Sequence, residues 1–147
     1  MRKQPTLRER ALRLLARREH SRAELRRKLV AHLTPEDDLE ALLGDLLQRK
    51  LLSDERYAES RVHSLSRKFG AARIAHELRA KGLDKGLADQ ASKAARATEV
   101  ERAREVWRRK FQIAPKTREE RARQMRFLQS RGFSFDAIRV VVGGKDD

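Results

Sequence analysis

Apolar residues recur along this chain at the three- and four-residue spacing of helices that bury one face. The first such run, Leu7 to Leu15, predicts a helix that begins after Thr6. Ser21 and Glu24 have the spacing of a capping box, in which two side chains bond reciprocally to first-turn backbone groups, so a second helix is expected there. Its predicted buried residues are Leu25, Leu29 and Leu33.

The next segment predicts an acidic helix with a broad apolar face. Thr34 is expected to cap it, and Pro35 suits the first helical position because the missing N–H would have no partner there. Residues 34–47 contain five acidic and no basic residues, so this helix is expected to neutralise arginines on its neighbours. Its apolar stripe comprises Leu39, Leu42, Leu43, Leu46 and Leu47.

A pair of helices separated by Gly70 is predicted between Ser53 and Gly82. Ser53 is expected to cap the first helix, and Gly82 to end the second in the left-handed conformation that glycine adopts most readily. The predicted inward residues are Tyr57, Ala58, Arg61, Val62, Leu65 and Phe69 in the first helix, and Ile74, Ala75 and Leu78 in the second.

Four further helix starts are predicted downstream. Pro115 is expected to end the helix that begins after Thr98, because the residue before a proline disfavours helical backbone. The helix after Asp84 is expected to bury Leu87, Ala91, Ala94 and Ala95, whose small side chains allow close helix approach. The predicted caps are Asp84, Thr98 with Glu101, Thr117 with Glu120, and Ser134.

The nine predicted helices fall into three similar groups of three. Leu29, Leu78 and Leu128 occupy matching places, 49 and 50 residues apart, and Gly82 matches Gly132. Such self-similarity is typical of tandem helical repeats. We therefore expect an all-α fold, an elongated, curved array of three tandem three-helix repeats. The repeats are assigned to residues 1–52, 53–97 and 98–143, with a frayed lead-in at 1–5 and a disordered tail at 144–147.

The composition favours a large, positively charged surface. Charged residues make up 39% of the chain, and 36 Lys and Arg against 22 Asp and Glu give a net charge of +14. Such a surface attracts polyanions and acidic proteins. The absence of cysteine excludes disulfides and thiol chemistry. No signal peptide and no apolar run long enough for a membrane span is seen, so we expect a cytoplasmic protein without membrane contact.

No arrangement typical of an enzyme stands out. The chain has no glycine-rich phosphate loop ending in Lys-Ser or Lys-Thr. Its four histidines are scattered, and none lies four residues from another as a metal-binding pair on one helix would. We therefore expect no catalytic residue, no metal and no cofactor, and the basic residues become the candidates for function.

Two segments resemble the RecX family of bacterial recombinase regulators. The family's first-repeat motif resembles EHSRAELRRKL, residues 19–29. Its more diagnostic second-repeat motif resembles LSDERYAESRVHSLSRKFGAARIAHELRAKG, residues 52–82, whereas the resemblance is weak after Ala95. The matching positions of the second motif are Asp54, Arg56, Tyr57, Ala58, Arg61, Arg67, Lys68, Gly70, Arg73, Ile74, Glu77, Leu78, Lys81 and Gly82.

The resemblance implies an elongated regulator that lies in the groove of the RecA–DNA filament. Such a protein would inhibit the ATPase and strand-exchange activities of RecA, by blocking filament extension or favouring disassembly. Its setting would be recombination, DNA repair and the SOS response. The partners to expect are the RecA filament and the phosphates of single- and double-stranded DNA, bound by a monomer.

Basic residues at similar positions in successive repeats are expected to form one stripe along the array. Some are expected only to pair locally, as Arg22 with Glu19 or Arg73 with Glu77. Arg61 falls within an apolar face and is expected to form a buried ion pair between repeats. The predicted surface for RecA and DNA comprises Arg17, Arg18, Arg22, Arg26, Arg27, Lys28, Arg61, Arg67, Lys68, Arg73, Arg79, Lys81, Arg108, Arg109, Arg118, Arg121 and Arg123, with Lys110 beside them.

Two mechanisms remain open at this point. Either the stripe contacts RecA and DNA together, or the protein is a general DNA-binding protein, helix-turn-helix-like or architectural, that affects RecA only by competition. A helix-turn-helix transcription factor would need one recognition helix, whereas the basic residues here spread over all repeats. Aromatic residues make up only 5% of the chain, so phosphate contacts rather than base stacking are expected to dominate.

Overall fold

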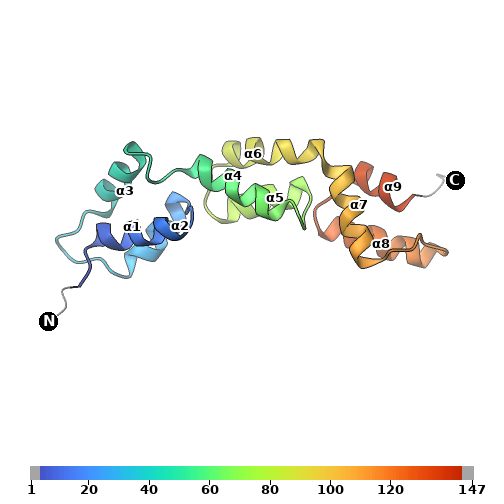
Figure 1. Cartoon of the computed structure of the whole chain (residues 1–147), viewed down its shortest axis with the longest axis horizontal. Coiled ribbons are helices and arrows are strands. Elements are labelled where there is room, and N and C mark those ends of the chain that lie inside the picture. The colour runs from blue at the N-terminus through green and yellow to red at the C-terminus, as the bar shows by residue number, and fades with distance from the viewer. Residues whose placement is uncertain (1–3, 144–147) are drawn as a thin grey trace.

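The computed structural model describes residues 4–143, and within that range the chain forms nine α-helices and no strand. The helices follow one another in an elongated, gently arched array (Figure 1). Their bounds are α1 (Leu7–Arg17), α2 (Arg22–Val30), α3 (Leu39–Gln48), α4 (Asp54–Leu65), α5 (Ala71–Ala80), α6 (Lys85–Ala97), α7 (Glu99–Lys110), α8 (Arg118–Ser130) and α9 (Phe135–Val142).

The helices form three units, each with its own hydrophobic core. Unit 1 consists of α1–α3, unit 2 of α4–α6 and unit 3 of α7–α9. Leu29, Leu78 and Leu128 are each almost completely buried, one in each core, as their matching places in the sequence predict. The third helices of the units lie along one long side of the array, with α2 and α8 toward the other (Figure 1). The predicted array of three-helix repeats is confirmed.

Most of the predicted helix caps are confirmed. The Ser21 hydroxyl oxygen accepts a hydrogen bond from the Glu24 N–H at 3.0 Å, and that of Ser53 accepts from the Arg56 N–H at 3.2 Å. First-turn N–H groups have no partner within their own helix, so each such cap stabilises a helix by about 1 kcal/mol. The side chains of Asp84, Thr117 and Ser134 cap α6, α8 and α9 in the same way.

The helix start predicted at Thr34 is wrong. The hydroxyl and backbone N–H of Thr34 donate to the Asp37 carboxylate at 3.1 and 2.9 Å, which closes a turn instead. Helix α3 begins at Leu39, and Asp38 caps it by accepting from the Ala41 N–H at 3.0 Å. Thr34 caps no helix, because a turn follows it and helical backbone begins only at Leu39.

The capping box predicted at Thr98 is also wrong. Thr98 is the only residue between α6 and α7, and its hydroxyl oxygen accepts from the Arg102 Nε at 3.1 Å rather than from a first-turn N–H. The C-terminal end of α7 is Lys110, five residues before Pro115, where the break was predicted. Two residues after this end, Gln112 has a positive φ of 66°.

Some predicted buried faces differ from the observed ones by one position. Leu33 and Leu47 are 41% and 36% exposed, because they lie at or beyond the ends of the faces that pack in unit 1. In α6, Ala88 and Ser92 are buried, the predicted Leu87 and Ala91 are partly buried against the same core, and the predicted Ala94 is exposed. Ala95 is buried as predicted.

Unit 2 attaches to unit 1 at the N-terminus of α2. Asp54, the first residue of α4, accepts a hydrogen bond from the Arg22 backbone N–H at 2.7 Å. The Ser21 hydroxyl donates to the Lys81 carbonyl, at the end of α5, at 2.9 Å. A helix N-terminus attracts negative charge and offers N–H groups that lack partners, so a carboxylate from the next unit is a stabilising neighbour.

Unit 3 attaches to unit 2 through the same arrangement. Glu99, the first residue of α7, is buried and accepts from the Ala71 N–H at the start of α5, at 3.0 Å. The Gly70 N–H donates to the Arg131 carbonyl, at the end of α8, at 2.8 Å. The two junctions therefore have the same form. In each, the N-terminus of the second helix of one unit is bonded by the following unit, through an acid at the start of that unit's first helix and a backbone carbonyl at the end of its second helix.

Arg102 adds a further set of bonds to the second junction. Its guanidinium group donates to the backbone carbonyls of Ser66, Phe69 and Ala95, at 3.0, 2.5 and 2.5 Å. These carbonyls lie near the C-terminal ends of α4 and α6, where a cation is favourable. Burial lowers the pKa of Arg102, and the carbonyl oxygens compensate for the lost hydration.

Gly82 and Gly132 are required where the units meet. Both have positive φ angles, 87° and 85°, as their predicted role at helix ends demands. A β-carbon on Gly132 would clash with the Arg73 β-carbon and lie 2.6 Å from the Arg73 backbone nitrogen. A β-carbon on Gly82 would clash with that of Ala23. These glycines thus permit both the backbone turn and the close approach of the next unit.

None of the helices formed by residues 4–143 is long and apolar enough to cross a lipid bilayer. The tail predicted at 144–147 lies outside the described residues, as do residues 1–3 of the predicted lead-in.

Gly132→Ala is expected to lower the free energy of unfolding by about 2 kcal/mol or more, because it combines left-handed strain with a backbone clash. Gly44→Ala is the matched control. Gly44 lies inside α3 with open space around it, so that substitution should raise stability by roughly 0.5–1 kcal/mol. Urea denaturation followed by circular dichroism measures both. Equal stabilities for the two variants would contradict the junction geometry.

Candidate functional site

Three shallow grooves lie at similar places in the three units, each lined mainly by the first two helices of a unit and, in units 2 and 3, also by residues of the preceding unit. The grooves have volumes of about 370, 270 and 300 Å³ in units 1, 2 and 3. The unit 1 groove is lined by Arg10, Arg13, Leu14, Arg17, Lys28, Leu29 and His32. The unit 2 groove is lined by Arg18, Glu19, Glu24, Tyr57, Ser60, Arg61, Ser64 and Lys81. The unit 3 groove is lined by Arg67, Lys68, Val106, Arg109, Lys110, Phe127 and Arg131. A larger hollow of about 420 Å³, which contains Glu101 and Glu105, shares Arg67 and Arg109 with the unit 3 groove.

The grooves gather only part of the predicted basic stripe. Arg17 and Lys28 line the unit 1 groove; Arg18, Arg61 and Lys81 the unit 2 groove; and Arg67, Lys68, Arg109 and Lys110 the unit 3 groove. The remaining predicted residues line none of these three grooves. They are Arg22, Arg26, Arg27, Arg73, Arg79, Arg108, Arg118, Arg121 and Arg123.

An acid on α3 binds two of the predicted surface arginines. Glu40 accepts from Arg26 at 2.8 Å and from Arg22 at 2.5 Å, and these bonds lower the pKa of the Glu40 carboxyl. Helix α3 therefore neutralises neighbouring arginines, as its acidic composition predicts. The predicted pairing of Arg22 with Glu19 is wrong, because Glu19 instead bonds Arg56 of unit 2 at 2.8 Å.

Other predicted cations in units 2 and 3 are also paired within the chain. Arg73 bonds Glu77 at 3.1 Å, four residues on, which confirms the predicted local pair. Arg79 bonds Asp89 on α6 at 3.3 Å. Arg108 bonds Glu105 at 3.1 Å. Exposed pairs of this kind add little stability, but they reduce the positive charge that these side chains offer to a partner.

Arg61 does not form the buried ion pair predicted for it. It is only half-buried, and among residues 4–143 it makes no ion pair. Its side chain lines the unit 2 groove beside Tyr57, where solvent can hydrate the guanidinium group.

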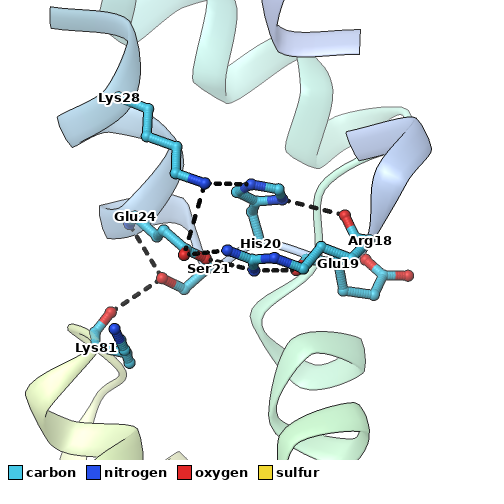
Figure 2. A network of polar contacts seen from close by, with 7 residues as sticks. All are labelled: Arg18, Glu19, His20, Ser21, Glu24, Lys28 and Lys81. Atoms are coloured by element: carbon cyan, nitrogen blue, oxygen red, sulfur yellow. Dashed lines mark hydrogen bonds and ion pairs between the residues drawn. The ribbon is translucent and has the colours of Figure 1, made fainter. Parts of the chain in front are cut away.

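His20 belongs to a network of polar contacts at the start of α2 (Figure 2). The His20 ring is 1% exposed and lies between two partners, with Nδ1 3.1 Å from the Arg18 carbonyl and Nε2 3.0 Å from the Lys28 ammonium. Burial lowers the pKa of His20, and the charges of Arg18 and Lys28 lower it further. The ring is therefore neutral at pH 7, with Nδ1–H donating to the carbonyl and Nε2 accepting from Lys28.

Glu24 carries the negative charge of this network. Burial by itself would raise the pKa of its carboxyl, but two hydrogen bonds from Arg18, at 3.0 and 2.6 Å, outweigh burial and hold that pKa at about 2. Lys28 lies 3.9 Å away on the same side. Because Ser21 links this region to Lys81 (Figure 2), the network supports the first junction. Within residues 4–143, no group of three or more His, Cys, Asp or Glu is placed to hold a metal ion.

The unit 3 groove, like the unit 1 groove and unlike the unit 2 groove, is lined by no acidic residue. The Lys110 ammonium and the Arg131 guanidinium lie 5.1 and 5.0 Å from the centre of the Phe127 ring, within reach of cation–π attraction. The remaining cations of this groove, Arg67, Lys68 and Arg109, are exposed and make no ion pair with any described residue.

Sequence reasoning missed three basic residues that line the grooves. Arg10 and Arg13 line the unit 1 groove beside Arg17, at the three- and four-residue spacing of one helix face. Arg131 directly precedes Gly132, just as Lys81 precedes Gly82, so aligning the repeats on these glycines could have found it.

Glu24→Gln is expected to lower the free energy of unfolding at pH 7 by about 1.5–3 kcal/mol, the range for hydrogen bonds to charged groups. The Glu24 carboxyl titrates near 2 in the fold and near the ordinary 4.5 in the unfolded chain, so between these values the unfolded chain binds more protons. Its contribution is thus complete above pH 4.5 and is lost as the pH falls toward 2.

Urea denaturation of both proteins across this pH range measures the difference in stability. Glu36→Gln, an exposed acid outside the network, is the control and should show little difference at any pH. A Glu24→Gln difference that stays constant from pH 6 to pH 2 would refute the role given to Glu24.

Comparison with known proteins follows the order of the three units. Sequence models of the RecX first, second and third three-helix domains match residues 8–46, 53–91 and 97–142. The crystal structure of RecX from Lactobacillus salivarius superimposes with a TM-score of 0.80, covering 92% of each chain at 24% sequence identity, a similarity of fold.

Close relatives match almost the whole chain. The regulatory protein RecX of Leptothrix cholodnii is 51% identical over 141 residues, which cover 96% of this chain and 90% of that protein. The regulatory protein RecX of Herbaspirillum seropedicae is 49% identical over 135 residues, covering 91% and 87%. With three family domains in order and relatives of this similarity, the chain belongs to the RecX family of regulatory proteins.

Proposed function

We propose that this protein regulates RecA by binding the filament that RecA forms on DNA and inhibiting its ATP hydrolysis and strand exchange. Membership of a family of regulatory proteins supports this proposal. The observation that carries it is the recurrence of a groove bearing basic residues in every unit. A series of similar grooves along a rigid array suits a partner that is itself a repeating polymer.

The proposed direct contacts are the basic residues that form no ion pair within residues 4–143. Arginines already bonded to Glu40, Glu77, Asp89 or Glu105 have less free charge to offer. The direct contacts from the predicted surface are Arg17, Arg27, Arg61, Arg67, Lys68, Lys81, Arg109, Arg118, Arg121 and Arg123.

In this proposal the protein acts in the cytoplasm as a monomer, during recombination, DNA repair and the SOS response. It catalyses no reaction itself and needs no metal or cofactor, since inhibition requires only that it occupy the filament. Its three repeats, at residues 1–52, 53–97 and 98–143, would act together as one binding surface.

A second function, general DNA binding without RecA contact, is favoured by the grooves that lack acidic residues. In that case inhibition of RecA would come from competition for DNA. The two functions differ in the amount of protein required, because a filament-bound regulator acts on many RecA subunits whereas a competitor must cover the DNA.

The test is RecA ATPase activity on single-stranded DNA as the protein is titrated in. The proposal predicts inhibition well below one protein per RecA. Inhibition that appears only when the DNA is fully coated would replace the proposal with simple competition. If the RecA ATPase is not inhibited even at one protein per RecA, the proposal that this protein inhibits RecA is wrong.

A further inference from the structure

The three grooves differ in one respect that bears on what binds them. Arginine or lysine lines each of them, but only the unit 2 groove contains carboxylates, those of Glu19 and Glu24. The grooves of units 1 and 3 contain none. The unit 1 and unit 3 grooves are therefore more positive than the unit 2 groove, although Arg67 and Arg109 of the unit 3 groove also line a neighbouring hollow that contains Glu101 and Glu105.

The cations of the unit 3 groove are free and held close together. Arg67 and Lys68 follow the C-terminal end of α4, and Arg109 and Lys110 form that of α7. Helix C-termini carry a partial negative charge, which favours cations there without neutralising them as a carboxylate would. Arg131 and Lys110 lie against the Phe127 ring, so this ring is covered and is poorly placed to stack on a base.

The unit 1 groove offers a smaller set of similar cations. Arg13 and Arg17 are exposed and make no ion pair with any described residue. Arg10 makes one long contact, 3.4 Å to the neutral amide of Gln4. Lys28 turns partly toward His20 and Glu24.

The unit 2 groove offers a chain of phosphates less free positive charge than the other two grooves. Glu24 stays ionised there because Arg18 binds it at 2.6 Å. Glu19 is bonded to Arg56 at 2.8 Å. The cations that remain, Arg61 and Lys81, thus share the groove with two carboxylates, each paired with an arginine.

We propose that the unit 1 and unit 3 grooves each bind phosphates of one nucleic-acid backbone, and that the unit 2 groove between them does not. Phosphate is favoured over protein carboxylates because arginine dominates both grooves and its planar fork matches phosphate oxygens. The binding is independent of base sequence, since the grooves present cations rather than aromatic faces. This inference rests on the proposed function only in taking nucleic acid as a partner.

Two separated contacts on one strand have a measurable consequence. Binding at one groove raises the effective concentration of the strand at the other, so the loss of either groove weakens binding by more than that groove's own contacts. The logarithm of the binding constant falls linearly with the logarithm of the salt concentration, and the steepness of this line, the salt slope, increases with the number of phosphates that the protein neutralises.

The experiment titrates the protein alone, without RecA, into fluorescein-labelled oligothymidylate at several NaCl concentrations. Three double variants each remove two positive charges: Arg13→Ala with Arg17→Ala, Arg67→Ala with Arg109→Ala, and, as the matched control, Arg22→Ala with Arg26→Ala. Of the control residues Arg26 is exposed and Arg22 half-buried, and both are bonded to Glu40. Thermal unfolding by circular dichroism checks that all variants fold.

Each groove variant is expected to bind more weakly and to reduce the salt slope by about 1.4, the value for two phosphates on a single strand. The control should change the slope by less than half as much. Equal changes in all three variants would show that net charge alone governs binding and would overturn the proposal. The proposal would also be overturned if the wild-type protein did not bind the oligonucleotide.

One further outcome separates nucleic acid from protein as the ligand. Groove variants that bind DNA normally but bind RecA filaments weakly would assign the grooves to an acidic protein surface and refute the proposal. The oligothymidylate titration contains no RecA, so its result is independent of the ATPase titration that tests the proposed function.

Discussion

The arrangement of the whole molecule depends on one repeated contact, the N-terminus of a second helix held by the unit that follows. At α2 the partners are the Asp54 carboxylate and the Lys81 carbonyl; at α5 they are the Glu99 carboxylate and the Arg131 carbonyl. First-turn N–H groups need partners outside their own helix, and a helix N-terminus favours negative charge. These two requirements are met only when the next unit sits in one orientation.

This contact also fixes the position of the grooves. Arg18 and Glu19 of unit 1 reach the groove of unit 2, and Arg67 and Lys68 of unit 2 reach that of unit 3. A shift of one unit against the next would separate these side chains from the helices they face. The rigidity of the junctions, with glycines that admit close backbone approach, is therefore what turns a basic composition into defined patches of charge.

The sequence predicts the local features of this fold and not the contacts between distant residues. Caps such as Ser21 and the left-handed Gly132 are predictable because their signals lie within a few residues. Nothing in the sequence near Glu99 indicates that its partner is Ala71, 28 residues earlier. The acidic composition of α3 predicts that it pairs with arginines, but it does not show which ones, since Glu40 and its partners Arg22 and Arg26 lie on different helices.

Amide hydrogen exchange tests the repeated junction most directly, because the chain contains its own control. Gly70 and Ala71 donate across the second junction. Arg118 and Glu119 lie at the N-terminal end of α8, the second helix of unit 3, and their N–H groups have no partner among the described residues. After correction for intrinsic rates, Gly70 and Ala71 should exchange about a hundredfold or more slowly than Arg118 and Glu119. Similar rates at all four amides would contradict the account.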